Sequence, residues 1–503
     1  MALQGSTVVT RPVGASTPDP RRWIGLAAIV IAQFMVVLDV AIVNVALPSI
    51  KSSLNFSQEG LQWVITAYSI MFGGVLLLGG RMADLLGRRL LFMSGIALFT
   101  TSSLLAGFAW SEASLIAFRA LQGLGGALLA PAALSILTTT FAEGRERNIA
   151  LGVWGAVSGS AAAAGVLLGG VLTSQLNWSW IFFVNVPVGA LVVAASPWLL
   201  RESRADLNHR HFDFTGAASV TGGLMLLVYA LTRAAQHGWG TVETIVLLAA
   251  STALIVGFVV VELRSKAPLL PMRIFRKRSL TGANVTGFLI GSAIFSQFFL
   301  TTLYMQEVLH YSALKTGVAY ITLTATLIVL ANVAQTLVTR IGVRRVLPVG
   351  LSLAAVALLL YTRLPVHGHY FFDLFPALLI SGIGLAFAFI PVTIAALSGV
   401  EPADAGVASG LLNTSQQVGG AIGLAAATTI ATSFTSHYVH SHPGASAVGG
   451  AALTYGFHIA FYALAGLAAL AALLSFALIE SKPAEAGDEV APPAEALAME
   501  EAA

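Results

Sequence analysis

The sequence predicts an all-α polytopic membrane protein with fourteen transmembrane helices. Of its 503 residues, 57% are apolar and only 10% are charged, whereas a soluble domain carries about 25% charged residues. Apolar stretches close to the ~20 residues that span ~30 Å of hydrocarbon recur along the whole chain. These stretches lie at about 23–48, 61–80, 90–110, 113–138, 148–173, 180–200, 214–233, 242–263, 280–305, 313–339, 346–362, 370–396, 404–434 and 452–479.

The positions of the basic residues predict which side of the membrane each connection faces. Alternate connections hold 21 of the 26 Lys and Arg residues, and such residues stay on the cytoplasmic side. An even number of helices places both ends on that side, so we expect a multi-pass protein of the plasma (inner) membrane with both termini cytoplasmic. Because the positive charge is distributed along the chain, it does not indicate nucleic-acid binding.

An internal repeat divides the chain. GRRLLFMSG (87–95) follows the second predicted helix and GVRRVLPVG (342–350) follows the tenth. Two six-helix blocks in the same orientation let transporters place a site between two halves, so we expect a 6+2+6 layout of two pseudo-symmetric six-helix bundles. The expected parts are a cytoplasmic tail (1–22), an N-terminal bundle (23–200), a linker (201–279) with extra helices at about 214–233 and 242–263, a C-terminal bundle (280–479) and a disordered acidic cytoplasmic tail (480–503).

The first predicted helix contains one acid, Asp39, within LDVAIVNVALP (38–48). An ionised Asp in a bilayer costs ~2.5–3.5 kcal/mol on insertion scales and usually has a partner. Counting from the outer helix ends places Asp39 ~13 Å deep and Arg119 of the fourth helix ~9 Å deep, so Arg119 is the expected counter-ion. Two interpretations stay open, a static pair that joins two helices and a switch in which Asp39 alternates between a proton and a substrate cation. Gln122 lies one turn below Arg119, within reach through a water.

The connection after the second helix carries GRMADLLGRR (80–89). Glycine permits tight turns and close backbone approach, and a carboxylate can bind a helix N-terminus or an Arg. We therefore expect a conformational latch that joins the two halves on the cytoplasmic side. Its members are Gly80, Asp84, Gly87, Arg88 and Arg89. This spacing resembles the loop signature of the major facilitator superfamily.

Further motifs resemble the fourteen-helix drug:proton antiporter family of that superfamily, the multidrug efflux type. They are LDVAIVNVALP, RALQGLGGALLAP (119–131), GVLLGG (165–170), LNWSWIFFVNVPVG (176–189), LYMQEVLHYSALKTG (303–317) and ASGLLNTSQQVGGAIG (408–423). The resemblance implies a major-facilitator-like fold in which helices one and four line a central cavity, and close packing at Gly165, Gly169 and Gly170. Val166 stands where the family usually has Pro, and Ala41 where it usually has Thr.

Polar and aromatic residues inside the other helices are candidates for a substrate cavity. Aromatic rings can form walls for a lipophilic cation, although packing of small and polar helix faces explains the amides of helix thirteen equally well. Glu307 is the best-placed acid of the second half, and we expect it at the membrane interface rather than in the cavity. The candidates are Asn44, Trp63, Tyr68, Gln122, Trp154, Phe298, Tyr304, Gln306, Glu307, Phe389, Asn413, Gln416 and Gln417.

The function that we expect is export of small amphipathic or drug-like compounds in exchange for protons by alternating access, with the protein acting as a monomer in the lipid bilayer. No enzymatic activity, cofactor or metal site is expected, because the chain has no Cys and no phosphate-binding loop of the Gly-rich Lys-Ser/Thr type. One alternative is a uniporter, or a dedicated exporter of one metabolite or antibiotic, on the same fold. A remote alternative is a proton-pumping subunit of a redox complex, which needs mid-membrane Lys residues that this chain lacks.

Overall fold

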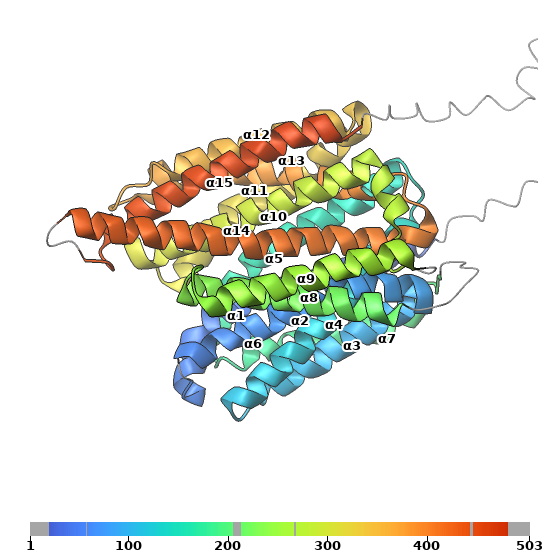
Figure 1. Ribbon diagram of the computed structural model, residues 1–503, viewed down its shortest axis with the longest axis horizontal. Helices are drawn as coiled ribbons and strands as arrows, with labels where there is room; N and C mark the ends of the chain where they lie inside the picture. The colour runs from blue at the N-terminus through green and yellow to red at the C-terminus, as the bar shows by residue number, and fades with distance from the viewer. Residues whose placement is uncertain (1–19, 57, 205–212, 266–267, 443–445, 481–503) are drawn as a thin grey trace, which may run out of the picture.

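The computed structural model describes residues 20–56, 58–204, 213–265, 268–442 and 446–480, and within these ranges the regular structure is helical throughout (Figure 1). The first part contains α1 (Arg22–Leu54), α2 (Gln58–Leu86), α3 (Arg88–Gly107), α4 (Glu112–Thr140), α5 (Arg145–Gln175), α6 (Trp180–Phe183) and α7 (Asn185–Leu199). The middle contains α8 (Phe214–His237), α9 (Val242–Arg264) and η1 (Met272–Arg276). The last part contains α10 (Arg278–Leu303), η2 (Tyr304–Val308), α11 (Ala313–Ile341), α12 (Val343–Tyr361), η3 (Tyr370–Leu374), α13 (Phe375–Leu397), η4 (Pro402–Asp404), α14 (Ala405–Ser441) and α15 (Gly450–Leu478).

The predicted fold class is confirmed. Among the described residues, 13 helices are long and apolar enough to cross a membrane. The remaining predicted stretch, 148–173, falls on α5, which is continuous over Arg145–Gln175 and passes through Val166 without a break. The tails at 1–19 and 481–503 lie outside the described residues, so the expectations for them stay predictions.

The helices pack as two bundles with an extra pair. In the N-terminal part, α4 packs on α2 and α3, and α1 packs on α5 and α7. In the C-terminal part, α10 packs on α14 and α15, and α12 packs on α13 and α15. Contacts of α5 with α11 and of α2 with α14 join the two bundles, and α8 of the extra pair lies against both α2 and α14 (Figure 1).

The two copies of the internal repeat have the same local structure. Gly87 before α3 has φ +124° and Gly342 before α12 has φ +83°, a region that favours glycine because it has no Cβ. Eight residues further on, Gly95 packs against Gly125 of α4, and Gly350 packs in the same way against Gly384 of α13. The repeated motif therefore starts a helix and then brings it close to the helix that follows.

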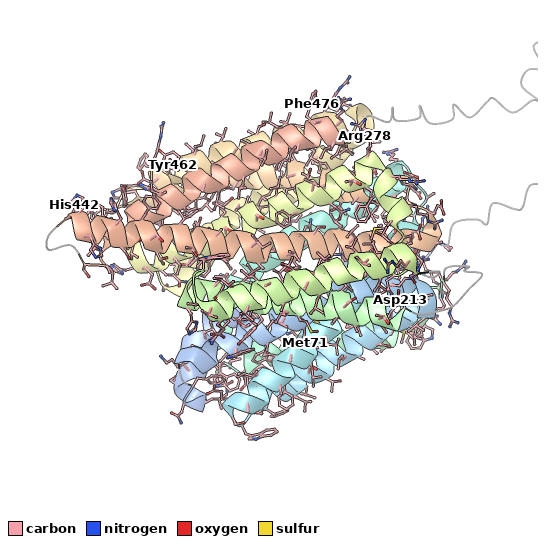
Figure 2. The ribbon with its side chains drawn as sticks, in the orientation of Figure 1. Met71, Asp213, Arg278, His442, Tyr462 and Phe476 are labelled. Atoms are coloured by element: carbon pink, nitrogen blue, oxygen red, sulfur yellow. The ribbon has the colours of Figure 1, made fainter. Side chains whose placement is uncertain are left out.

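The helices run between two ends of the molecule. Asp213, Arg278 and Phe476 lie at one end and His442 at the other (Figure 2). The end with Arg278 is where α1 begins and α15 ends, and it also holds the connection at Arg88. It is called the basic end below, and the end with His442 is called the far end.

One expectation about an element boundary is wrong. Residues 80–86 of the latch motif are the last two turns of α2 rather than a loop, because Met82, Ala83, Leu85 and Leu86 are good helix formers and Gly87 has a positive φ. The apolar stretch 180–200 forms one candidate membrane span, Trp180–Leu199, in which α6 and α7 follow each other through Val184, whose backbone is helical.

Candidate functional site

The side chain of Asp39 is fully buried and meets three donors. Arg119 Nη1 donates to Asp39 Oδ2 at 2.5 Å, and Gln122 Nε2 donates to Asp39 Oδ1 at 2.8 Å. Asn185 Nδ2 reaches the same Oδ1 at 3.1 Å. Since a buried ion pair is stable only when its remaining hydrogen-bonding groups are satisfied, these amides explain how the pair is retained inside the bundle.

Arg119 is held on all sides. Its Nε donates to the Val64 carbonyl at 3.1 Å, and its Nη1 also donates to Gln122 Oε1 at 2.6 Å. Its Cζ lies 4.3 Å from the centre of the Tyr68 ring, a cation–π contact that strengthens when water is excluded. The guanidinium is thus fixed between α1, α2 and its own helix.

Glycine contacts bring these helices together. A Cβ on Gly123 would overlap the Tyr68 carbonyl of α2, and one on Gly125 would lie 2.6 Å from Phe99 N of α3. Both glycines belong to QGLGGAL, the stretch directly after Arg119. Close approach of α4 to its neighbours is therefore the local reason that Arg119 and Gln122 reach Asp39.

The predicted packing motif of helix five separates into two roles. A Cβ on Gly165 would lie 2.7 Å from Ala41 Cβ, and one on Gly169 would lie 3.0 Å from the Ile42 carbonyl. These two glycines therefore fit α5 onto α1, whereas Gly170 faces Leu314 of α11 at 3.4 Å. Ala41 packs against α5 and takes no part in the polar cluster around Asp39.

Two members of the cluster were missed by sequence reasoning. Ser103 of α3 accepts from Gln122 Nε2 at 3.2 Å and from Asn185 Nδ2 at 3.1 Å, and donates to the Phe182 carbonyl at 2.9 Å. Asn185 is the first residue of α7. A lone Asn in the apolar stretch 180–200 is the signal that points to it, because a polar side chain in a membrane helix needs a partner.

The C-terminal bundle has an uncharged counterpart. Gln297 Nε2 of α10 donates to Ser381 Oγ of α13 at 2.9 Å, and Ser381 Oγ reaches the Tyr361 hydroxyl of α12 at 3.5 Å. By chain order α10, α12 and α13 correspond to α1, α3 and α4. The same three positions of the repeat therefore hold a buried polar cluster in both bundles, with charge only in the first.

The latch motif is divided between two tasks. Asp84 accepts from the backbone N–H groups of Gly406 and Val407 in the first turn of α14, both at 3.1 Å, and from Arg88 Nη2 at 2.8 Å. Gly80 lies directly against Gly406 of the same helix. The carboxylate is well placed at a helix N-terminus, so Gly80 and Asp84 join α2 to the C-terminal bundle, and Arg88 pairs with Asp84.

The other two latch residues do not reach the C-terminal bundle in this structure. Arg89 Nη1 donates to the Leu200 carbonyl at 3.1 Å, at the end of α7. Gly87 packs against Glu202, whose carboxylate accepts from the backbone N–H groups of Arg89 and Leu90 at 3.1 Å each. Gly80 and Asp84 thus contact α14, whereas Gly87 and Arg89 contact the end of α7 and the residues after it. The role of the five residues as one latch stays a prediction.

Further polar contacts join the bundles at the same end. Among the described residues, Glu143 Oε1 accepts from the Gly399 N–H at 2.9 Å, and Asn148 Nδ2 donates to Thr339 Oγ1 at 3.1 Å. Ser409 Oγ lies 3.2 Å from the Pro131 carbonyl. With Asp84, these contacts close the basic end of the interface.

The remaining cavity candidates are scattered. Trp63 stacks on Tyr229 of α8 at 5.7 Å, Phe298 stacks on Tyr320 at 4.2 Å, and the Tyr304 hydroxyl donates to the Pro365 carbonyl at 2.5 Å. Asn44 and Glu307 are exposed. Trp154 is buried, and half-buried positions are held by Gln306, Phe389, Asn413, Gln416 and Gln417. Only Tyr68 and Gln122 of this set contact the Asp39–Arg119 pair.

The protein has two helical bundles, each with a buried polar cluster at the same position of the repeat, and contacts at a helix terminus close the interface at one end. This arrangement defines a membrane transporter of the two-bundle class. Residues 29–424 match the Major Facilitator Superfamily, and the chain belongs to that family, whose members are transporters rather than enzymes. This confirms the resemblance inferred from the sequence motifs.

Relatives and a solved structure agree with the assignment. Puromycin resistance protein pur8 of Streptomyces alboniger is 40% identical over 487 residues, which are 96% of each chain. Cephamycin export protein CmcT of Amycolatopsis lactamdurans is 40% identical over 409 residues, 80% of this chain and 84% of that one. Multidrug resistance protein Stp of Mycobacterium tuberculosis is 33% identical over 83% of this chain and 77% of its own length. The human organic anion transporter MFSD10 (TETRAN) shares the fold, with a TM-score of 0.63 at 18% identity over 91% of this chain and 99% of that one.

Proposed function

We propose that this protein exports small amphipathic, antibiotic-like compounds across the plasma membrane in exchange for protons. The names of relatives that match over most of the chain refer to puromycin resistance, cephamycin export and multidrug resistance, which supports export of drug-like molecules. The basic end faces the cytoplasm in this proposal, since Lys and Arg stay on that side. One chain holds both bundles, so a monomer is sufficient.

The observation that carries the coupling to protons is the position of Asp39. Among the described residues, it is the one acidic side chain that lies more than two turns from either end of its membrane-spanning helix. Acids at such positions are typical of proton relays in transporters. The uncharged Gln297–Ser381 pair at the corresponding position of the C-terminal bundle supports a single proton-binding group.

The cycle that we infer begins with Asp39 ionised and paired with Arg119. When Asp39 takes up a proton, it loses its charge and its attraction to Arg119, so the contacts with Gln122 and Asn185 rearrange. A cationic or polar substrate group can then compete with the proton for the same carboxylate. Release of the Asp84 contact to α14 opens the basic end, and its formation closes that end again.

The experiment is Asp39→Asn in proteoliposomes with an imposed proton gradient. Asn keeps the size and hydrogen-bonding capacity of the side chain but cannot take up and release a proton, so we expect protein of normal abundance without gradient-driven efflux. Glu307→Gln is the matched control, because it removes one exposed carboxylate near the far end. Normal gradient-driven efflux by Asp39→Asn would show that this carboxylate does not couple transport to protons.

A second candidate is a dedicated exporter of one compound, with or without proton coupling. Relatives named for single antibiotics, among them lincomycin and tetracenomycin C, favour it. Growth inhibition of strains with and without this gene, over a panel of unrelated antibiotics, separates one cargo from many. Proton flux on substrate addition separates antiport from uniport.

A further inference from the structure

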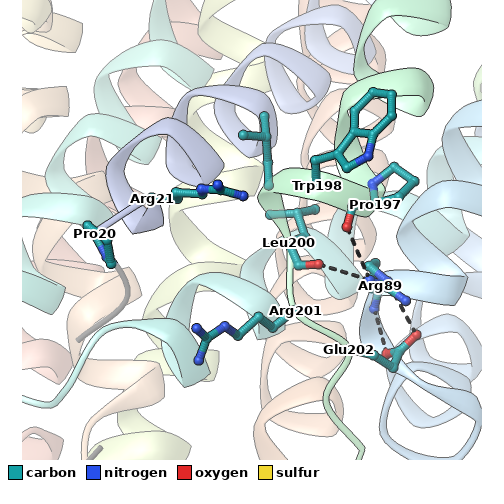
Figure 3. A pocket seen from close by; sticks show the side chains of 9 residues that line it. Pro20, Arg21, Arg89, Pro197, Trp198, Leu200, Arg201 and Glu202 are labelled. Carbon is teal, nitrogen blue, oxygen red and sulfur yellow. Dashed lines mark hydrogen bonds and ion pairs between the residues drawn. The ribbon is translucent and has the colours of Figure 1, made fainter. Parts of the chain in front are cut away.

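An open hollow of about 470 Å³ lies at the basic end of the N-terminal bundle (Figure 3). Three separate segments enclose it, namely the residues before α1, the first turn of α3 and the end of α7. Arg21, Arg89 and Arg201 line it, one from each segment, together with Trp198, Leu200 and Glu202. The residues that line the hollow are different from those that contact Asp39.

The lining has a net positive charge. It holds three arginines and one acid, Glu202, and of the three guanidinium groups that of Arg89 is paired with Glu202 (Figure 3). This carboxylate accepts from the backbone N–H groups of Arg89, Leu90 and Ser203, each at 3.1 Å, and is 3.9 Å from Arg89 Nε. Glu202 is therefore engaged by the start of α3, and Arg21 and Arg201 both have exposed side chains.

The wall formed by α7 is apolar and exposed. Trp198 is 73% exposed, and Leu191, two turns earlier on the same face of the helix, is 68% exposed. Tryptophan is enriched at the membrane–water interface, where its ring sits at the level of the headgroups. The hollow thus combines arginines at the depth of the headgroups with an apolar helix face that leads into the hydrocarbon.

We propose that this hollow binds the phosphate headgroup of an anionic phospholipid, with the acyl chains along the exposed face of α7. Arginine forms paired hydrogen bonds to phosphate oxygens, and cytoplasmic leaflets are rich in anionic lipids that attract basic segments. A free phosphate ion would use the arginines but not Trp198 and Leu191. The assignment to the cytoplasmic leaflet rests on the proposed orientation, whereas binding itself does not depend on the transport function.

The site is connected to the latch. The Arg88 N–H donates to the Ser203 carbonyl at 3.0 Å, and Arg88 Nη1 lies 3.4 Å from Ser203 Oγ. The same side chain pairs with Asp84, which holds α14. A headgroup that orders residues 201–203 therefore acts on the arginine that orients Asp84, and binding favours the closed basic end.

The test measures retained lipid on the full-length purified protein by native mass spectrometry. Delipidated protein is incubated with phosphatidylglycerol, with phosphatidylcholine, or with inorganic phosphate alone. We expect preferential retention of phosphatidylglycerol, reduced several-fold in Arg21→Gln/Arg201→Gln. The matched control is Arg278→Gln/Arg345→Gln, which removes two exposed arginines from the same end of the C-terminal bundle and is expected to retain lipid as the parent protein does.

A second readout does not depend on the arginine variants. Brominated phosphatidylglycerol should quench part of the tryptophan fluorescence, and Trp198→Phe should abolish that part. Equal retention of the two lipids, or equal loss in both double variants, overturns the proposal. Complete displacement of the lipid by inorganic phosphate assigns the hollow to the free ion and also overturns it. None of these outcomes depends on efflux, so failure here is distinguishable from failure of the proposed function.

Discussion

Gln122 lies between the two charges of the N-terminal bundle and contacts both. Its amide oxygen accepts from Arg119 Nη1 at 2.6 Å, and its amide nitrogen donates to Asp39 Oδ1 at 2.8 Å. Since Arg119 also contacts Asp39 directly, the three side chains form a closed ring. Protonation of Asp39 therefore disturbs two contacts at once, and the ring links the charge state of α1 to the position of α4.

Removing Arg119 should be more damaging than neutralising the pair. Arg119→Ala leaves a buried carboxylate without its counter-ion, and breaking a buried pair in this way costs about 3–5 kcal/mol. Asp39→Asn/Arg119→Gln should recover most of that loss, because the result is an uncharged cluster like the one at Gln297. Thermal unfolding of the purified variants in detergent measures both effects. If the double variant is as unstable as Arg119→Ala, the loss does not come from an uncompensated charge.

Asn185 should matter for stability and transport although it carries no charge. Asn185→Ala removes a hydrogen bond to the Asp39 carboxylate, and bonds to charged groups contribute about 1.5–3 kcal/mol. The expected result is a lower unfolding temperature together with reduced gradient-driven efflux. Asn44→Ala is the matched control, because Asn44 is exposed and donates to the Val40 carbonyl of its own helix. Equal effects of the two variants would rule out a specific role for Asn185.

Much of the fold and part of the site can be predicted from sequence because the bilayer imposes simple rules. Helix number follows from apolar length, and the depth of Asp39 and Arg119 follows from a constant rise per residue. Asn185 and Ser103 could not be placed, because their approach to Asp39 depends on how α7 and α3 pack against α1 and α4. The contacts of Gly87 and Arg89 with Leu200 and Glu202 could not be predicted for a related reason, since they depend on where α2 ends.

The contact between Gly80 and Gly406 should tolerate no side chain. A Cβ on Gly80 would overlap the Gly406 carbonyl, and overpacking typically costs about 1–3 kcal/mol. Gly80→Ala should therefore separate α2 from α14 and reduce efflux. Gly466→Ala is the control, since nothing lies within 4 Å of a Cβ at that position of α15. Unchanged efflux in Gly80→Ala would show that the two helices do not need this close approach.

Loss of Asp84 should open the basic end, and the absence of Cys from the chain makes that opening measurable. Ser409 of α14 is fully buried, with its hydroxyl 3.2 Å from the Pro131 carbonyl of the N-terminal bundle. In the parent background, we expect Ser409→Cys to resist a membrane-impermeant maleimide added to the basic end. In the Asp84→Ala background we expect it to react, because two N–H groups of α14 lose their acceptor. Asp373→Ala serves as the control, since this Asp accepts from the His369 N–H within its own turn. Labelling at the same rate in all three backgrounds would mean that Asp84 does not hold the two bundles together, and the latch would then have to depend on Glu143 and Asn148 instead.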